Sequence, residues 1–320
     1  MANWNDLPLE MKEMVVKRMN LETRTQLKQC SKADKDLVAS IRINKLNIKV
    51  KSMVHLKINV KLHRDELDKS DIDLSIWNYR SKVVIKNLNT DDVDNAKHWN
   101  CSSGEEAKKW LEQMFASIVS SFSFDSVYVE IDAPDFIENP EFTIHTNYIH
   151  IKGSASPTIG LLKNVAPRVK SVNIITYYNE KLEDIANIPA VVNAKNLEVF
   201  GLNDINDEQL LNLNCTSWNF DCKSNITAKG INQLIKKAIT NNHLKGSIIV
   251  FHIDENVIFQ TWEDIIEGLD VEVTESEDVT LNDGQVKFGK RRGRIQMNHG
   301  KWMNLYQLNN FGMLQIKIHQ

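Results

Sequence analysis

Few residues in this chain of 320 have the types and spacing that chemistry requires. Glu141, His145 and His150 are the set closest to a metal site, since carboxylate oxygens and imidazole nitrogens bind divalent metals. Histidines five residues apart on a strand point to opposite faces, because strand side chains alternate. We therefore interpret both histidines as surface residues.

Catalytic motifs are absent from the sequence. It contains no GxxxxGK[ST] phosphate loop, no GxGxxG behind a strand, no HExxH and no GxSxG. We expect a protein that is not an enzyme and that uses neither a cofactor nor a metal ion.

Basic residues gather in two stretches. Lys287–Arg294 holds five of them around two glycines; it fits RNA binding, a nuclear-import signal or a solvated turn, and we favour the turn. Between residues 45 and 64, apolar residues alternate with lysines such as Lys49, Lys51, Lys57 and Lys61. This period of two predicts a hairpin with one buried face and one lysine face. The lysines either block edge pairing, which we favour, or face an acidic partner.

Charge and cysteine content bound the class of protein. Residues 1–64 hold 14 Lys and Arg against 6 Asp and Glu, while the whole chain has a net charge of −3.

The four cysteines, Cys30, Cys101, Cys215 and Cys222, show no CxxC spacing and are interpreted as core thiols. No leader or bilayer-spanning run is evident, so we expect the protein inside the cell, in the cytoplasm, the nucleus or both.

The first forty residues are the element around which the rest is organised. Pro8 fixes its own φ and keeps Leu7 out of the helical region, so a helix begins here. Its apolar residues recur on one face: Met11, Val15 and Met19. Ser31 and Asp34 form a capping-box pattern for a later helix. Helices this short bury little apolar surface, so the unit needs a partner surface.

This stretch resembles the F-box, a three-helix module that docks on the Skp-type adaptor of a cullin ubiquitin ligase. The resemblance rests on Leu7-Pro8, Glu10-Met11, Val15-Val16, Met19, Leu27 and Cys30-Ser31-Lys32. The sequence departs from the family at Arg24-Thr25, where aliphatic residues are common, and at Asp34-Lys35, where an aromatic is frequent. The resemblance implies an adaptor-binding site made of Leu7, Pro8, Leu9, Met11, Val15, Leu27 and Cys30.

Residues 103–122 carry the clearest helical pattern in the chain. Ser103 and Glu106 form a capping box, and apolar residues then recur at helical spacing without a break. We expect Trp110 and Phe115 to lie in the core beneath the first strand that follows.

An apolar-x-x-apolar-x-apolar pattern repeats from Phe124 onward. Its central residues are Val127, Ile149, Val172, Phe200, Trp218 and Ile249, spaced 18 to 31 residues apart. This spacing is close to the ~20–29 residues of a leucine-rich-type unit of one strand plus one helix or turn. Stacked units of this kind form a curved solenoid with parallel strands. An ordinary α/β domain with right-handed crossovers is the alternative.

The C-terminal region also resembles the F-box-associated domain of nematode-type F-box proteins. Ala107–Leu111, Ile226–Ile235 and, weakly, Leu281–Phe288 carry this resemblance. In that family the domain is taken to bind substrates. The last part, from Val271 to Ile318, has turn residues at 282–284 and 309–312, which suggest antiparallel strands that close the array.

These observations predict an α/β fold: an N-terminal three-helix F-box followed by an irregular leucine-rich-repeat-like α/β solenoid. The expected domains are an F-box at 1–42, the lysine-rich hairpin and a connecting segment with one strand near Val83 at 43–102, and a substrate-binding domain at 103–320.

The expected function is the substrate-recognition subunit of a Skp-cullin-F-box-type E3 ubiquitin ligase. Its partners would be a Skp-type adaptor, through it a cullin, and a protein substrate, with no membrane. One alternative is a nucleic-acid-binding protein that uses residues 45–64 and 287–294; another is an interaction scaffold outside any ligase. Salt dependence separates ligase from nucleic-acid binding, since phosphate contacts weaken steeply with salt.

Overall fold

The computed structural model of the chain describes most of its length. The described residues are 4–19, 21–52, 56–63, 72–79, 82–87, 96–133, 142–177, 180–221, 225–241, 248–252, 263–280, 287–296, 302–308 and 313–319. The chain divides into two compact units, residues 1–151 with 164–166, and residues 152–163 with 167–320. The predicted domain boundaries at residues 42 and 102 stay predictions. Across the described part of the chain, no helix combines the length and apolarity needed to cross a bilayer.

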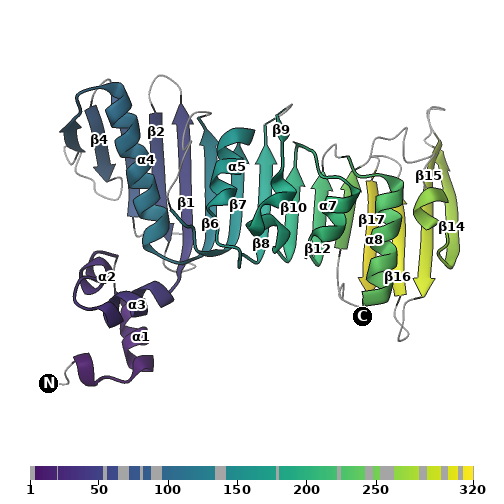
Figure 1. Ribbon diagram of the computed structural model, residues 1–320, viewed down its shortest axis with the longest axis horizontal. Helices are drawn as coiled ribbons and strands as arrows, with labels where there is room; N and C mark the ends of the chain where they lie inside the picture. Colours follow the sequence, from purple (N-terminus) through teal and green to yellow (C-terminus); the bar gives the residue numbers. More distant parts are fainter. Residues whose placement is uncertain are drawn as a thin grey trace. The chain divides into compact units, whose positions relative to one another are not determined.

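The first unit begins with short helices (Figure 1): η1 (Trp4–Asp6), α1 (Leu9–Arg18), α2 (Leu21–Leu27) and α3 (Lys32–Ser40). Pro8 is the N-cap residue of α1, where a missing N–H leaves no helical hydrogen bond unmade. Ser31 caps α3, and its Oγ accepts a 3.0 Å hydrogen bond from the amide of Asp34, as the capping pattern predicts. A small core joins the helices: Val16, Leu37, Val38 and Ile41.

The sheet of the first unit has the strand order β7-β6-β1-β2-β3-β4-β5. The bounds are β1 (Ile43–Ser52), β2 (Leu56–His63), β3 (Ile72–Tyr79), β4 (Lys82–Asn87), β5 (Ala96–Asn100), β6 (Phe124–Asp132) and β7 (Thr146–Gly153). The predicted hairpin is present as antiparallel β1 and β2, and β1 also pairs in parallel with β6. Since β2 pairs with β3 on its far side, both lysine strands lie inside the sheet. Edge protection is therefore the wrong explanation for the lysines, because neither strand is an edge.

Three strands lie between the hairpin and the long helix, where the sequence predicted one. β4 contains the predicted strand around Val83, and β3 and β5 pair with it in antiparallel fashion on either side. In β3, apolar Ile72, Leu74 and Ile76 alternate with polar neighbours, which is the period of a strand. This part of the predicted connecting segment is a meander of the sheet.

The long helix α4 (Gly104–Ser121) contacts β3 and β4. The Oγ of Ser103 caps it by accepting a 3.2 Å hydrogen bond from the amide of Glu106. Its buried stripe recurs every four residues: Ala107, Leu111, Phe115 and Val119. Phe115 lies in the core, as predicted, whereas Trp110 is half-buried and its ring centre lies 5.6 Å from that of Trp99.

The second unit is built on parallel strands that alternate with helices. Neighbouring strands are β8 (Ser171–Thr176), β10 (Asn196–Phe200), β12 (Ser217–Asp221) and β13 (Ile248–His252). The connecting elements are α5 (Ala155–Lys163), β9 (Lys181–Leu182), η2 (Ile185–Asn187), α6 (Pro189–Val192), β11 (Leu202–Asn203), α7 (Asp207–Asn212) and α8 (Ala228–Asn241). In Figure 1, α5, α7 and α8 lie on the same side of these strands. The fold is mixed α/β, and all six predicted repeat positions fall in strands: β6, β7, β8, β10, β12 and β13.

The strand register corrects one repeat position. Val172 lies opposite Leu197, which lies opposite Trp218 in the next strand. Leu197 is fully buried whereas Phe200 is partly exposed, so Leu197 and not Phe200 is the equivalent residue in β10. The sequence pattern matched three residues too late because it included Leu202, which belongs to the separate strand β11.

The C-terminal strands are antiparallel, as predicted: β14 (Val271–Thr280), β15 (Lys287–Gln296), β16 (Trp302–Leu308) and β17 (Met313–His319), with β17 paired to β13. The predicted turns at 282–284 and 309–312 lie outside the described residues.

The basic run 287–294 lies on β15, so its interpretation as a solvated turn is wrong. The register places Arg294 opposite Glu272, and Arg292 opposite Glu275. Opposite charges at cross-strand positions stabilise an antiparallel pair. The register thus sets acidic positions of β14 opposite basic positions of β15.

Candidate functional site

Exposed apolar side chains are concentrated on α1. Within the described part of the chain, five large hydrophobic side chains are exposed, and four of them belong to this helix. They are Leu9, 59% exposed, Met11, 51%, Met14, 55%, and Val15, 39%, while the fifth is Trp99 at 37%. Apolar side chains that gather on one surface mark an interaction site, whereas single ones are ordinary.

Helix geometry explains how α1 carries two apolar sides. Met11, Met14 and Val15 are spaced i, i+3 and i+4, so they lie on one side of the helix. Val16 points elsewhere, into the small core, and is fully buried. Leu9, seven residues before Val16, lies on the Val16 side of the helix but is exposed at the first turn. We call Leu9, Met11, Met14 and Val15 the exposed α1 surface.

The other residues predicted for this site have different surroundings. Pro8 is exposed at the start of α1, and Leu7 is half-buried with its amide donating to the carbonyl of Trp4 at 3.3 Å. Leu27 is half-buried and packs against the core of the helices. Cys30 is exposed, and its thiol lies 3.5 Å from the carbonyl of Gln26.

Sequence reasoning missed Met14, the most exposed large apolar side chain on α1 after Leu9. Its spacing of three residues from Met11 was the feature that would have found it.

Arg24 joins α1 to α2 from a buried position. The side chain is only 2% exposed. Its Nε donates to the carbonyl of Val16 at 3.0 Å, and its Nη2 donates to the carbonyl of Lys17 at 3.0 Å. Both carbonyls lie in the last turn of α1, where the helix dipole favours a cation, and the carbonyl of Val16 also accepts from the amide of Met19 at 3.1 Å. Arg24 therefore ties α2 to the C-terminal end of α1.

Asp34 ties the N-terminal turn to α3. Its carboxylate accepts 2.7 Å from the Ser31 hydroxyl and 2.8 Å from the Trp4 indole N–H. The hydrogen bond from Ser31, followed by that from Trp4, lowers the pKa of Asp34 below its ordinary value. Asp34 thus holds the indole of Trp4 against α3, although the two residues are thirty positions apart in the sequence.

Comparison with known families identifies this helical module. Residues 4–46 match the model of the F-box domain. Residues 4–46 form an F-box domain. The match includes all three helices and ends inside β1. No curated protein and no solved structure matches the chain. An F-box suggests a substrate-adaptor role in Skp-cullin-F-box ubiquitin ligases, and F-box proteins are typically non-catalytic substrate receptors.

Side chains connect the F-box to the helix that covers the sheet. Phe122, the C-cap residue of α4, packs against the F-box core. The Nζ of Lys28 lies 4.0 Å from the centre of the Phe122 ring, which is cation–π geometry. Burial against this surface lowers the pKa of Lys28, and the charge of Lys35 lowers it further.

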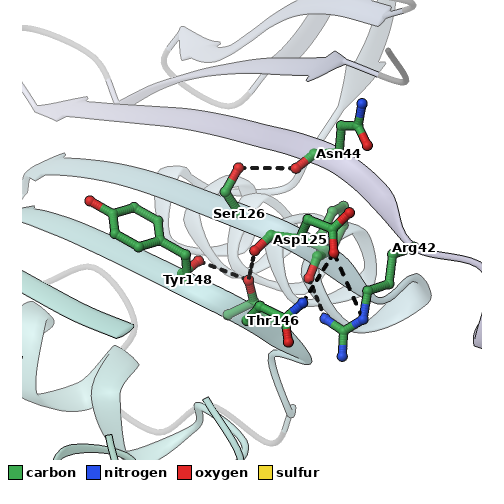
Figure 2. Close-up of polar contacts among 8 residues, drawn as sticks. Arg42, Asn44, Asp125, Ser126, Thr146 and Tyr148 are labelled. Atoms are coloured by element: carbon green, nitrogen blue, oxygen red, sulfur yellow. Dashed lines mark hydrogen bonds and ion pairs between the residues drawn. The ribbon is translucent and has the colours of Figure 1, made fainter. Parts of the chain in front are cut away.

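Arg42 connects the end of the F-box to the strands (Figure 2). Its Nη1 donates to the carbonyl of Phe124 at 2.6 Å, and its Nε lies 3.9 Å from Oδ1 of Asp125. The same oxygen of Asp125 accepts from the amide of Asn147 at 3.1 Å. Arg42 thereby links β6 and, through Asp125, β7. These side chains are partly exposed, so their main effect is geometric and the ion pair itself adds little energy.

Metal-ligating residues do not gather in the part of the chain that is described, where no group of three or more His, Cys, Asp or Glu has the geometry to hold an ion. His150 lies on β7 with its ring centre 5.6 Å from that of Tyr128, while His145 precedes the strand and is exposed. Glu141 lies outside the described residues.

Proposed function

We propose that this chain is the substrate-recognition subunit of a Skp-cullin-F-box-type E3 ubiquitin ligase. In this proposal the exposed α1 surface binds a Skp-type adaptor and, through it, a cullin. The rest of the chain binds a protein target. The observation that carries the proposal is the concentration of exposed apolar side chains on the first helix of an F-box.

The exposed α1 surface has enough apolar area to support such binding. Its four side chains are 39% to 59% exposed, so a partner would remove about half of the ~1.5–3 kcal/mol available from burying each one completely. Four contributions of about 1 kcal/mol each correspond to roughly a thousandfold in Kd. Leu7, Pro8 and Cys30 border this surface in our proposal, and Leu27 supports it from the core side.

The proposed role needs no catalytic residue in this chain. Ubiquitin transfer would be accelerated because the target lysine is held near the ubiquitin-loaded conjugating enzyme, which is catalysis by proximity. The contacts of Phe122 and Arg42 support this role, since they join the adaptor-binding module to the folded region behind it.

We further propose that the region behind the F-box is an irregular leucine-rich-repeat-like array of the kind found in nematode-type F-box-associated domains. The succession β8, β10, β12 and β13 supports this proposal, because these strands are parallel and their equivalent residues are in register.

Adaptor binding by the full chain is the direct test. We expect Met11→Ser with Met14→Ser to lose about 2 kcal/mol of binding energy, or roughly thirtyfold in affinity for a purified Skp-type adaptor. Isothermal titration calorimetry measures this loss. The matched control is Trp99→Ser, which removes the fifth exposed apolar side chain from outside the F-box and should bind normally. No measurable binding by the unmodified chain would overturn the proposal and favour an interaction scaffold outside any ligase.

A further inference from the structure

Lysines and tyrosines share one face of the first unit's sheet. On β1, Lys45, Lys49 and Lys51 alternate with the buried residues Leu46, Ile48 and Val50. The register places Asn47 of the same face opposite Lys61 on β2 and opposite Tyr128 on β6. Directly paired residues of neighbouring strands lie on the same face. The face therefore extends over β2, β1 and β6, which lie side by side in Figure 1.

Aromatic rings continue this face onto β7. The ring centre of Tyr128 lies 5.5 Å from that of Tyr148 and 5.6 Å from that of His150. The Nζ of Lys45 lies 4.6 Å from the centre of the Tyr128 ring on the β1 side. Tyr128 and Tyr148 are partly exposed. We call Lys45, Lys49, Lys51, Lys61, Tyr128 and Tyr148 the lysine–tyrosine face.

The position of the lysines excludes the common structural reason for such a pattern. Lysines on an edge strand prevent pairing with another chain. Here β1 has neighbours β6 and β2, and β2 has neighbours β1 and β3, so neither strand has an edge to protect. Four like charges on adjacent interior strands repel one another, which destabilises the sheet slightly. With no edge to protect, a face complementary to an acidic partner is the one of the two sequence interpretations that remains.

Charge within the face is only partly balanced. Lys49 forms a 2.8 Å ion pair with Glu130, Asp132 lies opposite Lys51, and Asp73 lies opposite Lys61 in the register. The register also places Lys57 on this face, opposite Lys51, so five lysine positions exceed three carboxylate positions and the face has a net positive charge. Such a surface attracts an acidic partner and speeds its association.

We infer that the lysine–tyrosine face binds an acidic, extended segment of the target protein, with the lysines facing carboxylates and the tyrosines facing apolar or aromatic side chains. The inference rests on the proposed function, because it assigns the target's chemical class to a surface of the receptor. Neighbouring strands are about 4.8 Å apart, so four strands span about 14 Å, the length of roughly four extended residues.

Two other acidic partners fit this face less well. Nucleic acid presents a phosphate at every residue. The basic residues of the face are all lysines, whereas arginine is the residue whose planar fork matches phosphate in two hydrogen bonds. The Skp-type adaptor is assigned to the exposed α1 surface, which is apolar.

Fluorescence anisotropy with the full chain tests the inference. The probe is a labelled peptide of alternating Glu and Tyr, and the reference probes are the same peptide with Gln in place of Glu and a labelled single-stranded oligouridine. We expect the Glu-Tyr peptide to bind more tightly than both. Lys45→Glu with Lys51→Glu should weaken it by about tenfold or more, since each exposed charge pair contributes a few-fold. The matched control is Lys229→Glu with Lys236→Glu, two exposed lysines of α8, which should bind the peptide normally.

A second variant and a second measurement keep the test decisive. Tyr148→Ala should weaken the Glu-Tyr peptide several-fold and leave a plain poly-Glu peptide unaffected, because only the ring contact is lost. Adaptor binding is measured in parallel and should be unchanged in the lysine variant, which also shows that its F-box is folded.

Three results would overturn the inference. These are equal affinity of the lysine variant and its control, tighter binding of oligouridine than of peptide, or loss of adaptor binding in the lysine variant only. Failure of the unmodified chain to bind the adaptor would instead refute the proposed function, so the two failures are distinguishable.

Discussion

Replacing Arg24 tests whether this buried arginine holds the F-box helices together. Arg24→Met keeps most of the side-chain volume and removes the two hydrogen bonds to the carbonyls of Val16 and Lys17. Hydrogen bonds from a charged donor contribute ~1.5–3 kcal/mol each, and removing the burial penalty of the charge offsets part of the loss. We expect a net loss of about 2–3 kcal/mol in the free energy of opening α1 and α2.

Hydrogen exchange of the full chain, followed by mass spectrometry, measures this change locally. A loss of that size raises the exchange of amides in α1 and α2 by roughly 30-fold to 150-fold. The amides of β8, β10 and β12 in the second unit should exchange as before. The control is Lys17→Met, an exposed residue of the same helix. Equal exchange rates in the two variants would refute the role given to Arg24.

Three further predictions concern the core, pH and a strained turn. Phe115→Ala should cost ~3–5 kcal/mol, because the ring is 1% exposed; denaturant unfolding of the first unit measures the loss. The hydrogen bond from Ser31 lowers the pKa of Asp34. The ionised carboxylate therefore stabilises the folded F-box above the ordinary aspartate pKa near 3.9, and this stabilisation is lost as the pH falls below that value. In Asp34→Asn, the protection of α3 amides from hydrogen exchange should therefore vary less across that pH range than it does in the unmodified chain. Gly201→Ala should destabilise the second unit by ~1–3 kcal/mol, because the backbone has φ +128° and a Cβ there would collide with Thr176, and its melting temperature should fall.

Local patterns predicted the regular elements well. Period-two alternation located β1 and β2, and helical spacing located α4, because each pattern follows from which side of one element is buried. The parallel strands of the second unit were found by their recurrent apolar triplets. Residues 72–79 were missed as a strand because acidic neighbours outweighed the alternation of Ile72, Leu74 and Ile76.

Features that depend on distant pairing were beyond sequence patterns. The lysines of β1 and β2 were assigned to an edge, because nothing local reveals that β6, some eighty residues later, pairs with β1. The basic run around Arg292 was assigned to a turn because it contains two glycines, although only six residues separate it from its acidic partner strand β14. Leu27 was assigned to the adaptor-binding surface, but it packs against the core of the helices. The sequence does not distinguish the two, because an apolar residue on a short helix can face either the core or a partner.

The two departures from the F-box pattern, Arg24 and Asp34, are explained by hydrogen bonds that only the structure shows. Arg24 replaces an aliphatic residue and holds the end of α1, while Asp34 replaces an aromatic and binds Trp4. In both cases the polar side chain takes over a fixing role through hydrogen bonds.

Oxidative footprinting of the two exposed methionines tests the central claim most directly. Met11 and Met14 are 51% and 55% exposed, so hydroxyl radicals should oxidise both readily in the free chain. With saturating Skp-type adaptor, the account predicts that oxidation of both residues falls several-fold while that of Trp99 is unchanged. A stable complex in which Met11 and Met14 are oxidised as fast as in the free chain would show that the adaptor binds elsewhere, and would contradict the account.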